Sequence, residues 1–490
     1  MTYASKIRRI WVMPVAVSCL WSCTSAVSDA DSKSGAGGTM STVALPNQLN
    51  IESESLGLIR NAKLLGNPAP EAALRALKNL DAAGTFGHSL ADGIKSLSYR
   101  IAGMTLCGET DGSKGDACNN RPFSIYNESE AERGNYDTFV PGDAAVTSFT
   151  KWTDFMKDGA IEELVGTVTY TDTQVGTYDS VIVNFYRTFK ANAEVQLNNG
   201  QKLYTKNATD FYTNNKPGLD VTYAGKSTNI TTGPSEEGIF FLPNGGKTFF
   251  LQRPFEITEA DVADLVPYKM ALAFDHNNFI KGSAHSAGSY TTNPPDWVDG
   301  QIDDTLGLSI KPGFMEFAPI LARESETIMR ETYVMSTNDM SAVGSTAKQS
   351  FSARLTLYYV KEDESKSIRA VTSRGYYNEH SVTYMSHDPV SGIRTIKDGT
   401  EAGTIDMAQS VGTEFLLFKG FKRLTTVGDS GTTSGQFCNG GVTNGVCDGT
   451  LNTFNWVYTF VGVSEAETEL TFEAVPPPPP PTEEGDTSGG

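Results

Sequence analysis

The sequence predicts a mainly β protein made of two antiparallel β-sandwich-like units with a few short helices. Two observations lead to this prediction: apolar residues recur with a period of two in many short segments, and tight-turn dipeptides lie between some of them. Hydrophobic residues are 39% and aromatic residues 10% of the 490 residues, which is enough apolar material to form cores. Wholesale disorder is therefore excluded.

Five segments carry the clearest alternation of apolar and polar residues. Their large apolar side chains are Val181, Val183, Phe185 and Phe189; Met270, Leu272 and Phe274; Leu355, Leu357 and Tyr359; Phe454, Trp456, Tyr458 and Phe460; and Leu470 and Phe472. Because successive side chains of a strand point to opposite faces, each pattern predicts a strand with one buried face.

Two Asn-Gly dipeptides lie between strand-like segments. Asn199-Gly200 separates VQL from KLY, and Asn244-Gly245 separates FFL from TFFL. Asn and Gly accept the positive φ angles of a type I′ turn, so both dipeptides predict β-hairpins.

Helical patterns are few. Residues 70–84 begin at a proline, end at a glycine and carry leucines at three-residue spacing, which predicts a helix. A second helix is predicted over 150–164, where four large apolar residues could share one side. Thr258 followed by Asp261 is a capping signal for one or two helical turns.

The N-terminus has the pattern of an exported protein. Residues 1–23 contain three basic residues, Lys6, Arg8 and Arg9, followed by an apolar run too short to span a membrane as a helix, which is typical of a secretory signal peptide. The end of this segment, Leu20 to Cys23, resembles a bacterial lipobox. The resemblance implies lipidation of Cys23 after removal of the signal peptide, and Thr24 in place of Asp implies the outer membrane. Two alternatives are secretion after cleavage at a residue such as Ala30, and an uncleaved anchor.

Composition divides the rest of the chain into four parts. Residues 24–45 form a small, polar tether. Residues 46–322 contain the predicted N-terminal helix and the first β-sandwich domain, and residues 323–475 form the second β domain. Residues 476–490 begin with six consecutive prolines and end in an acidic tail, which predicts an extended and then disordered end.

Four of the six cysteines lie outside the signal segment, in two close pairs. Cys107 and Cys118 flank one loop-like segment, and Cys438 and Cys447 flank another. Four cysteines allow three pairings, and proximity favours the two local disulfides. The alternative, a zinc site of all four cysteines, has spacings far wider than C-x-x-C and no histidine within either loop. Disulfides indicate an oxidising compartment.

Residues 95–322 contain the segments GTYDSVIVNFY, PFEITEADV, KMALAFD and GFMEFAPI. These segments resemble those of uncharacterised secreted β-sandwich lipoproteins of the bacterial outer membrane. The resemblance implies a sandwich fold and an envelope location, and it implies no activity.

The charge balance excludes one class of function. The chain carries 58 acidic and 39 basic residues, for a formal net charge of −19. Coating of nucleic acid requires clustered Lys and Arg that neutralise phosphates, so this role is excluded. An acidic surface also repels anionic lipid headgroups, so we expect the lipid anchor alone to hold the protein to a membrane.

One rival function is catalytic. The segment GDSG, Gly428 to Gly431, resembles the nucleophile loop of trypsin-like serine proteases. The resemblance would make Ser430 the nucleophile, His285 its base and Asp339 the residue that orients the base. Two threonines follow the segment where that family has Gly-Pro, and no cysteine follows the histidine.

Metal binding is another alternative. The candidate ligands are Asp275, His276 and His285; His380, His387 and Asp388; and, for calcium, the acidic loop 111–116 and Asp303 with Asp304. None of these sets matches an EF-hand or an H-E-x-x-H motif. Exposed aromatic residues on loops, Tyr376, Tyr377 and Trp297, are candidates for contact with a glycan or a protein.

These patterns together predict a lipid-anchored envelope protein that binds a protein or glycan ligand, with no catalytic residues, metal or cofactor. A secreted trypsin-like serine hydrolase and a calcium-dependent binding module are the alternatives.

Overall fold

The computed structural model describes the strands and many of their connections. The described residues are 37–45, 86–88, 94–108, 118, 120–128, 152–157, 159–196, 201–207, 210–213, 223–226, 230–241, 246–275, 280–284, 287, 300–312, 316–341, 348–377, 395–408, 416–439, 442–443, 446–447 and 450–467. All of them belong to one unit that begins at Gly37. The signal segment, the helix predicted over 70–84, the strand predicted around Leu470 and the proline-rich end lie outside the described residues.

The fold is mainly β, as the sequence predicts. The described residues form 27 strands, β1 to β27, and their helical turns are short. These turns are α4 (Ala160–Val165), the 3-10 helix η3 (Asp172–Gln174) and α5 (Glu259–Ala263). The capping prediction at α5 is confirmed. The Thr258 side chain accepts a hydrogen bond from the Asp261 amide at 3.1 Å, and the Asp261 carboxylate accepts one from the Thr258 amide at 2.8 Å.

The helix predicted over 150–164 is largely wrong. Its first part contains β5 (Thr153–Asp154), which pairs with β3 (Ile94–Cys107), and α4 begins only after it. Phe155 turns from this strand into the core, where its ring meets Tyr99 edge-on at 5.3 Å between centroids. The apolar residues of this segment therefore belong to a strand end and a turn.

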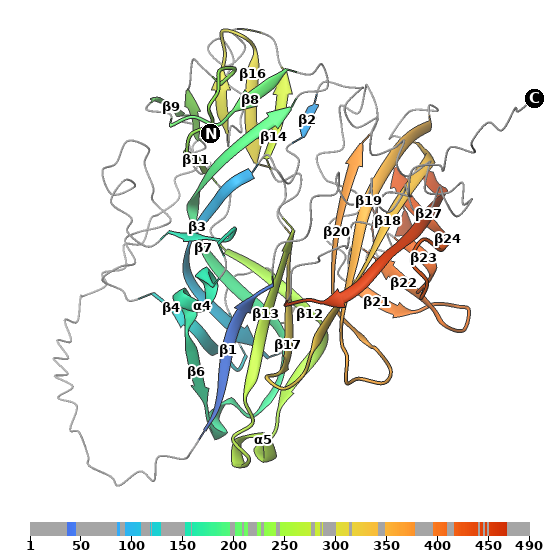
Figure 1. Ribbon diagram of the computed structural model, residues 1–490. Helices are drawn as coiled ribbons and strands as arrows, with labels where there is room; N and C mark the ends of the chain where they lie inside the picture. The colour runs from blue at the N-terminus through green and yellow to red at the C-terminus, as the bar shows by residue number, and fades with distance from the viewer. Residues whose placement is uncertain are drawn as a thin grey trace, which may run out of the picture. The chain divides into compact units, whose positions relative to one another are not determined.

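The small sheet has four strands in the order β17, β13, β1, β6 (Figure 1). Their bounds are Glu316–Arg323, Tyr268–Asp275, Gly38–Ala44 and Thr167–Tyr170. β1 runs parallel to β13, and the other neighbours are antiparallel. The tether predicted over 24–45 is therefore too long, because its last residues form β1 and Met40 is fully buried. β1 gains its hydrogen-bond partners from strands that are distant in sequence.

The large sheet has 13 strands. Besides β3 and β5 they are β4 (Phe123–Asn127), β7 (Gly176–Gln196), β2 (Phe86–His88), β14 (Ile280–Ala284), β16 (Leu308–Pro312), β15 (Gln301–Asp303), β10 (Tyr223–Lys226), β9 (Asp210–Thr213), β8 (Lys202–Tyr204), β11 (Gly238–Phe241) and β12 (Gly246–Ile257). The long strand β7 pairs with β2, β3, β8, β11 and β12. Its Val181, Val183, Phe185 and Phe189 are buried in the core, as the alternation predicts.

Of the two predicted hairpins, one is confirmed and one is wrong. β7 and β8 pair antiparallel on either side of Asn199-Gly200, with Val195 opposite Leu203. β11 and β12 do not pair with each other across Asn244-Gly245. Both instead pair with β7 and follow one another along it. The long strand β7 offers β11 and β12 more hydrogen bonds than a local hairpin would. The turn preference of an Asn-Gly dipeptide carries no information about a strand that is distant in the sequence.

The curled sheet, defined as β20, β19, β18, β27, β24, β23, β22 and β21 in spatial order, lies C-terminal to the other two (Figure 1). Its bounds in that order are Ile368–Tyr377, Lys348–Val360, Ile328–Ser341, Thr450–Glu465, Ser430–Asn439, Leu416–Lys422, Thr404–Ala408 and Thr395–Asp398. Side chains of β20 and β22, near opposite ends of this order, share one core, so the sheet curls. Phe454, Trp456, Tyr458 and Phe460 are buried in that core, as predicted.

The central strand β13 of the small sheet is buried on both faces. Tyr268, Met270 and Leu272 of β13 pack into the core of the large sheet. The intervening Ala271 and Ala273 pack, with residues of β17, against the outer face of the curled sheet. β17 is hydrogen-bonded within the small sheet, and β18, the next strand in the chain, is hydrogen-bonded within the curled sheet. The core that these two sheets share nevertheless joins the residues before and after this change. The predicted division into domains at 322/323 therefore stays a prediction.

Candidate functional site

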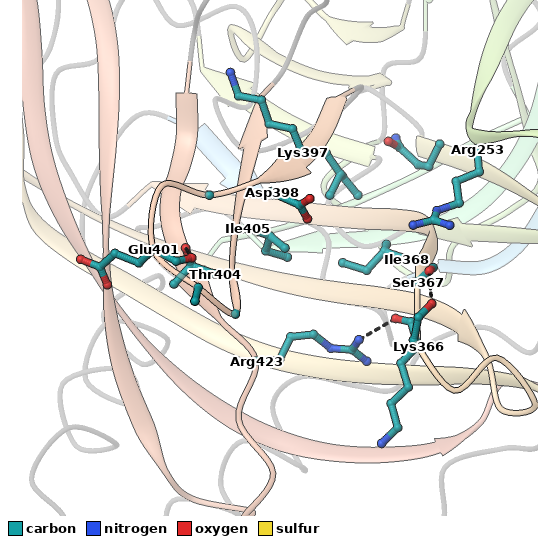
Figure 2. Close-up of a pocket in the computed structure, with 16 residues that line it drawn as sticks. Arg253, Lys366, Ser367, Ile368, Lys397, Asp398, Glu401, Thr404, Ile405 and Arg423 are labelled. Carbon is teal, nitrogen blue, oxygen red and sulfur yellow. Dashed lines mark hydrogen bonds between the residues drawn. The ribbon is translucent and has the colours of Figure 1, made fainter.

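A pocket of about 690 Å³ lies where the two edge strands of the curled sheet meet β12 (Figure 2). Small-molecule sites in proteins commonly enclose roughly 300–1,000 Å³. The residues that line it are Gln252 and Arg253 of β12, Ser365 to Ile368 before and at the start of β20, Ile396 to Asp398 of β21, most of the turn that leads into β22, and Arg423 after β23. β20 and β21 are consecutive in the chain but are not hydrogen-bonded neighbours.

A bulge in β12 brings Arg253 to this pocket. Phe250 pairs with Ser180 of β7 and Phe255 pairs with Tyr178, so four residues of β12 lie opposite one residue of β7. Pro254 has no amide hydrogen for the ladder, which favours such an interruption. Bulges redirect side chains, and this one directs Arg253 away from the β7 pairing and toward β20.

Arg423 forms the opposite wall and is held in one orientation. Its Nε donates to both carboxylate oxygens of Glu331, at 3.2 and 3.0 Å, and its Nη2 also contacts that carboxylate. Its Nη1 donates to the Lys366 carbonyl at 2.7 Å (Figure 2). The guanidinium carbon lies 4.7 Å from the centre of the Tyr359 ring.

Charge and burial act in opposite directions on Arg423. Burial alone would lower the pKa of its guanidinium, but the hydrogen bonds and the charge of Glu331 outweigh it and leave the pKa raised. Burial, and next the charge of Glu331, raise the pKa of Tyr333, whose hydroxyl donates to Glu331 and accepts from the Leu424 amide at 3.1 Å. Glu331 is thus anchored on one side and orients Arg423 on the other.

A tight turn before β20 shapes the third wall. The Asp363 carboxylate accepts hydrogen bonds from the amides of Ser365, at 3.0 Å, and Ser367, at 3.3 Å. Hydrogen bonding, first from the Ser365 hydroxyl, lowers the pKa of Asp363. Lys366 between them has a φ of 47°, a conformation that non-glycine residues adopt when the surroundings fix it. This turn presents the Lys366 carbonyl to Arg423.

The pocket combines an apolar floor with charges of both signs. Ile368, Ile396 and Ile405 belong to or border the core of the curled sheet. The lining has four basic side chains and two acidic ones, in a chain with a net charge of −19. In Figure 2, Arg253 and Asp398 point toward the space above the isoleucines, whereas Lys366, Lys397 and Glu401 point away from it.

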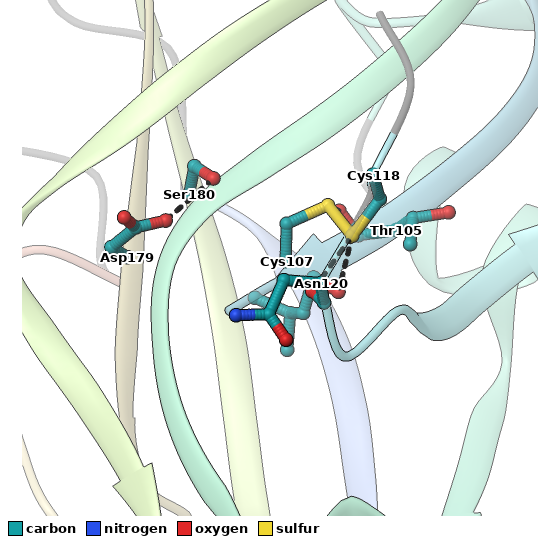
Figure 3. Close-up of a disulfide and its surroundings, with 7 residues drawn as sticks. Thr105, Cys107, Cys118, Asn120, Asp179 and Ser180 are labelled. Atoms are coloured by element: carbon teal, nitrogen blue, oxygen red, sulfur yellow. Dashed lines mark hydrogen bonds between the residues drawn. A yellow bond between two sulfur atoms is a disulfide. The ribbon is translucent and has the colours of Figure 1, made fainter. Parts of the chain in front are cut away.

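The first predicted disulfide is confirmed. Cys107 ends β3 and is bonded to Cys118, with 5.6 Å between the Cα atoms (Figure 3). β4 follows and pairs back onto β3, so the disulfide closes the connection of a β-hairpin. Cys438 and Cys447 lie in β24 and β26, but their side chains are outside the description, so that pairing stays a prediction. Cys23 also lies outside the described residues.

The rival serine triad gains no support from the strand register. The Ser430 hydroxyl lies 2.9 Å from the Thr459 hydroxyl of β27, and Thr459 pairs in turn with Val334 of β18. Asp339 is five residues farther along β18, roughly 16 Å at the usual strand rise of about 3.3 Å per residue. His285 lies outside the described residues.

The candidate metal ligands are not brought together where they are described. Asp303 and Asp304 are buried at the end of β15, and one Asp303 oxygen accepts from the Leu306 amide at 3.2 Å. Among the described residues, no group of three His, Cys, Asp or Glu side chains could hold a metal ion. The other candidates fall outside the description or have undescribed side chains. They are Asp275, His276, His285, His380, His387, Asp388 and the loop 111–116. The aromatic candidates for contact with a glycan or a protein, Tyr376, Tyr377 and Trp297, are likewise not described at the side-chain level.

Comparison of the chain with protein-family models, with curated proteins and with solved structures finds no match. Within the part of the chain that the structure describes, no helix is long and apolar enough to cross a membrane.

The sequence prediction missed the pocket because its residues come from four separate segments. One local signal was present: in FFLQRPFEI, the charged and proline residues Arg253 and Pro254 interrupt an apolar run. That break could have indicated a bulge that points a charge away from its own sheet.

Proposed function

We propose that this protein is a lipid-anchored protein of the bacterial cell envelope that binds a ligand in the pocket between β12 and the curled sheet, without catalysing a reaction. The observation that carries the proposal is the pocket itself. It has an apolar floor, an arginine pre-oriented by Glu331, and the charged groups of Arg253 and Asp398. Concave sites with a few fixed polar groups over apolar walls are typical of small-ligand binding.

Two features support the envelope location. The Cys107–Cys118 disulfide suits an oxidising compartment. The N-terminal signal pattern ends at Cys23, and small polar residues separate it from β1. A small, polar tether of this kind would leave the folded part free of the bilayer surface.

Acylation tests the anchor. The full-length chain is expressed in a bacterial host with a radiolabelled fatty acid, with and without globomycin, which blocks lipoprotein signal cleavage. We expect label in the mature protein, accumulation of the precursor under globomycin, and loss of label in Cys23→Ala. Unchanged processing with no label would refute the anchor.

A fluorophosphonate probe tests the claim that the protein is not a serine hydrolase. We expect no labelling of the purified full-length protein. Labelling that is lost in Ser430→Ala and retained in Ser434→Ala, a matched serine farther along β24, would instead support the hydrolase.

A further inference from the structure

We propose that the pocket binds a small zwitterion with an apolar side chain, such as a short apolar peptide with a free amino group and a free carboxylate. This inference rests on the proposed function, because it names the ligand class of the same site.

The first argument is the pair of opposite charges that face the pocket. Figure 2 shows the guanidinium of Arg253 and the carboxylate of Asp398 facing each other across the space above Ile368 and Ile405. Neither side chain forms an ion pair with the other or with any further residue that the structure describes. Both residues are exposed, and a ligand that carries both charges would pair with the two groups at once, whereas a simple anion would meet the repulsion of Asp398.

The second argument is the geometry of the basic side. Three of the five N–H groups of Arg423 are used by Glu331 and the Lys366 carbonyl, which leaves two without an acceptor among the described residues. A guanidinium fork matches a carboxylate with two parallel hydrogen bonds, and Glu331 fixes this fork before a ligand arrives. Arg253 and Arg423 therefore form the carboxylate end of the site.

The third argument is the floor. Ile368, Ile396 and Ile405 form an aliphatic surface between the charged walls, continuous with the core of the curled sheet. A branched aliphatic side chain would bury its surface there, and the volume of about 690 Å³ accommodates a ligand of dipeptide size.

Calorimetric titration of the full-length protein in detergent tests the inference with four probes: leucyl-leucine, N-acetyl-leucyl-leucine, leucyl-leucine amide and acetate. We expect leucyl-leucine to bind about tenfold or more tightly than either blocked derivative, because each block removes a charged hydrogen-bonding group. Acetate is expected to bind more weakly than leucyl-leucine.

Two variants assign the ends. Arg253→Gln should lower the affinity for leucyl-leucine and reduce the affinity lost on amidation of the probe, while Arg423 retains part of the preference for a free carboxylate. Asp398→Asn should lower the affinity for leucyl-leucine and reduce the affinity lost on acetylation of the probe. Lys419→Gln and Asp429→Asn remove the same charges at exposed positions outside the pocket and should leave the affinity unchanged. Unchanged thermal unfolding of each variant would show that it folds.

Three results would overturn the inference: no heat with leucyl-leucine, equal affinity for the blocked derivatives, or acetate binding as tightly as the dipeptide. Each is distinguishable from failure of the proposed function. Fatty-acid label at Cys23 does not depend on the pocket, and peptide affinity in solution does not depend on the anchor.

Discussion

Ion pairs in this protein differ in how deeply they are buried, and the burial determines how much each pair contributes to the free energy of unfolding. Glu331 is 6% exposed and Arg423 is 23% exposed, whereas Lys361 and Glu465 are 59% and 50% exposed. Water screens the exposed pair, so its contribution is small. Removing one partner of the buried pair leaves a charge that water cannot fully solvate.

Glu331→Gln should therefore lower the free energy of unfolding by about 2 kcal/mol, less than the loss typical of a fully buried pair, because Arg423 keeps some contact with water. Urea unfolding measures this change. Lys361→Gln is the matched control and should change the free energy by less than about 0.5 kcal/mol. Equal effects of the two variants would contradict the assignment of Glu331 as the residue that fixes Arg423.

Buried tyrosines limit the stability of the folded protein at alkaline pH. Burial raises the pKa of Tyr178 from 10.0 to about 12, and its hydroxyl donates to the Gln174 carbonyl at 2.7 Å. The neutral phenol is favoured in the folded state. Its contribution to stability is therefore complete below pH 10 and is lost as the pH rises toward 12.

Replacing the phenol by a phenyl ring tests this sign. Tyr178→Phe should be less stable than the wild type at pH 8, because it loses a hydrogen bond. The variant should lose less stability than the wild type between about pH 10 and 12, since it has no group there to ionise. Unfolding measured at several pH values provides the comparison, and parallel pH profiles for the two proteins would contradict the prediction.

At the scale of single elements, two strand pairs place a glycine under a tyrosine ring. Gly38 of β1 pairs with Tyr170 of β6, and Gly431 of β24 pairs with Tyr458 of β27. A Cβ atom on Gly38 would lie 2.1 Å from the Tyr170 ring, and one on Gly431 would lie 2.4 Å from the Tyr458 ring. Both rings are buried, so they cannot easily move aside.

Gly38→Ala should weaken the docking of β1 and lower the free energy of unfolding by about 1–3 kcal/mol, as overpacked cores do. Limited proteolysis near residue 40 and urea unfolding both report this change. Thr39→Ala, on the exposed side of the same strand, is the control and should leave proteolysis unchanged. Protection of β1 in Gly38→Ala equal to that of the wild type would show that the ring can shift.

The elements that sequence reasoning could find are those whose pattern is local. The alternation in β7 and in β27 is long enough to specify a buried face, and the Thr258 and Asp261 cap lies within one turn. β1 and the β11–β12 arrangement escaped prediction because distant strands decide them. The pocket escaped for the same reason, since Arg253 comes from the large sheet and Asp398 and Arg423 come from the curled sheet.

At the scale of the whole molecule, a layer of small residues joins the small sheet to the curled sheet. Ala271, Ala273, Ala318 and Ala322 face Ala370 and Ala466, together with larger residues of both sheets. Small side chains let two sheets approach closely, and Lys269 reaches across to Glu467 at 2.6 Å. A strand such as β13, with large residues on one face and alanine on the other, indicates that both faces are covered.

This layer predicts that the N-terminal and C-terminal strands unfold together. Hydrogen exchange should give peptides of β7 and β27 the same opening free energy in the wild type. Ala271→Leu would overpack the layer, lower that free energy by about 1–3 kcal/mol and let the two peptides exchange separately. Ala263→Leu makes the same change at an exposed position of α5 and should have little effect. Different opening free energies for β7 and β27 in the wild type would contradict this prediction and show that residues 46–322 and 323–475 are independent domains. In that case the pocket between β12 and β20 would form only when the two domains contact each other.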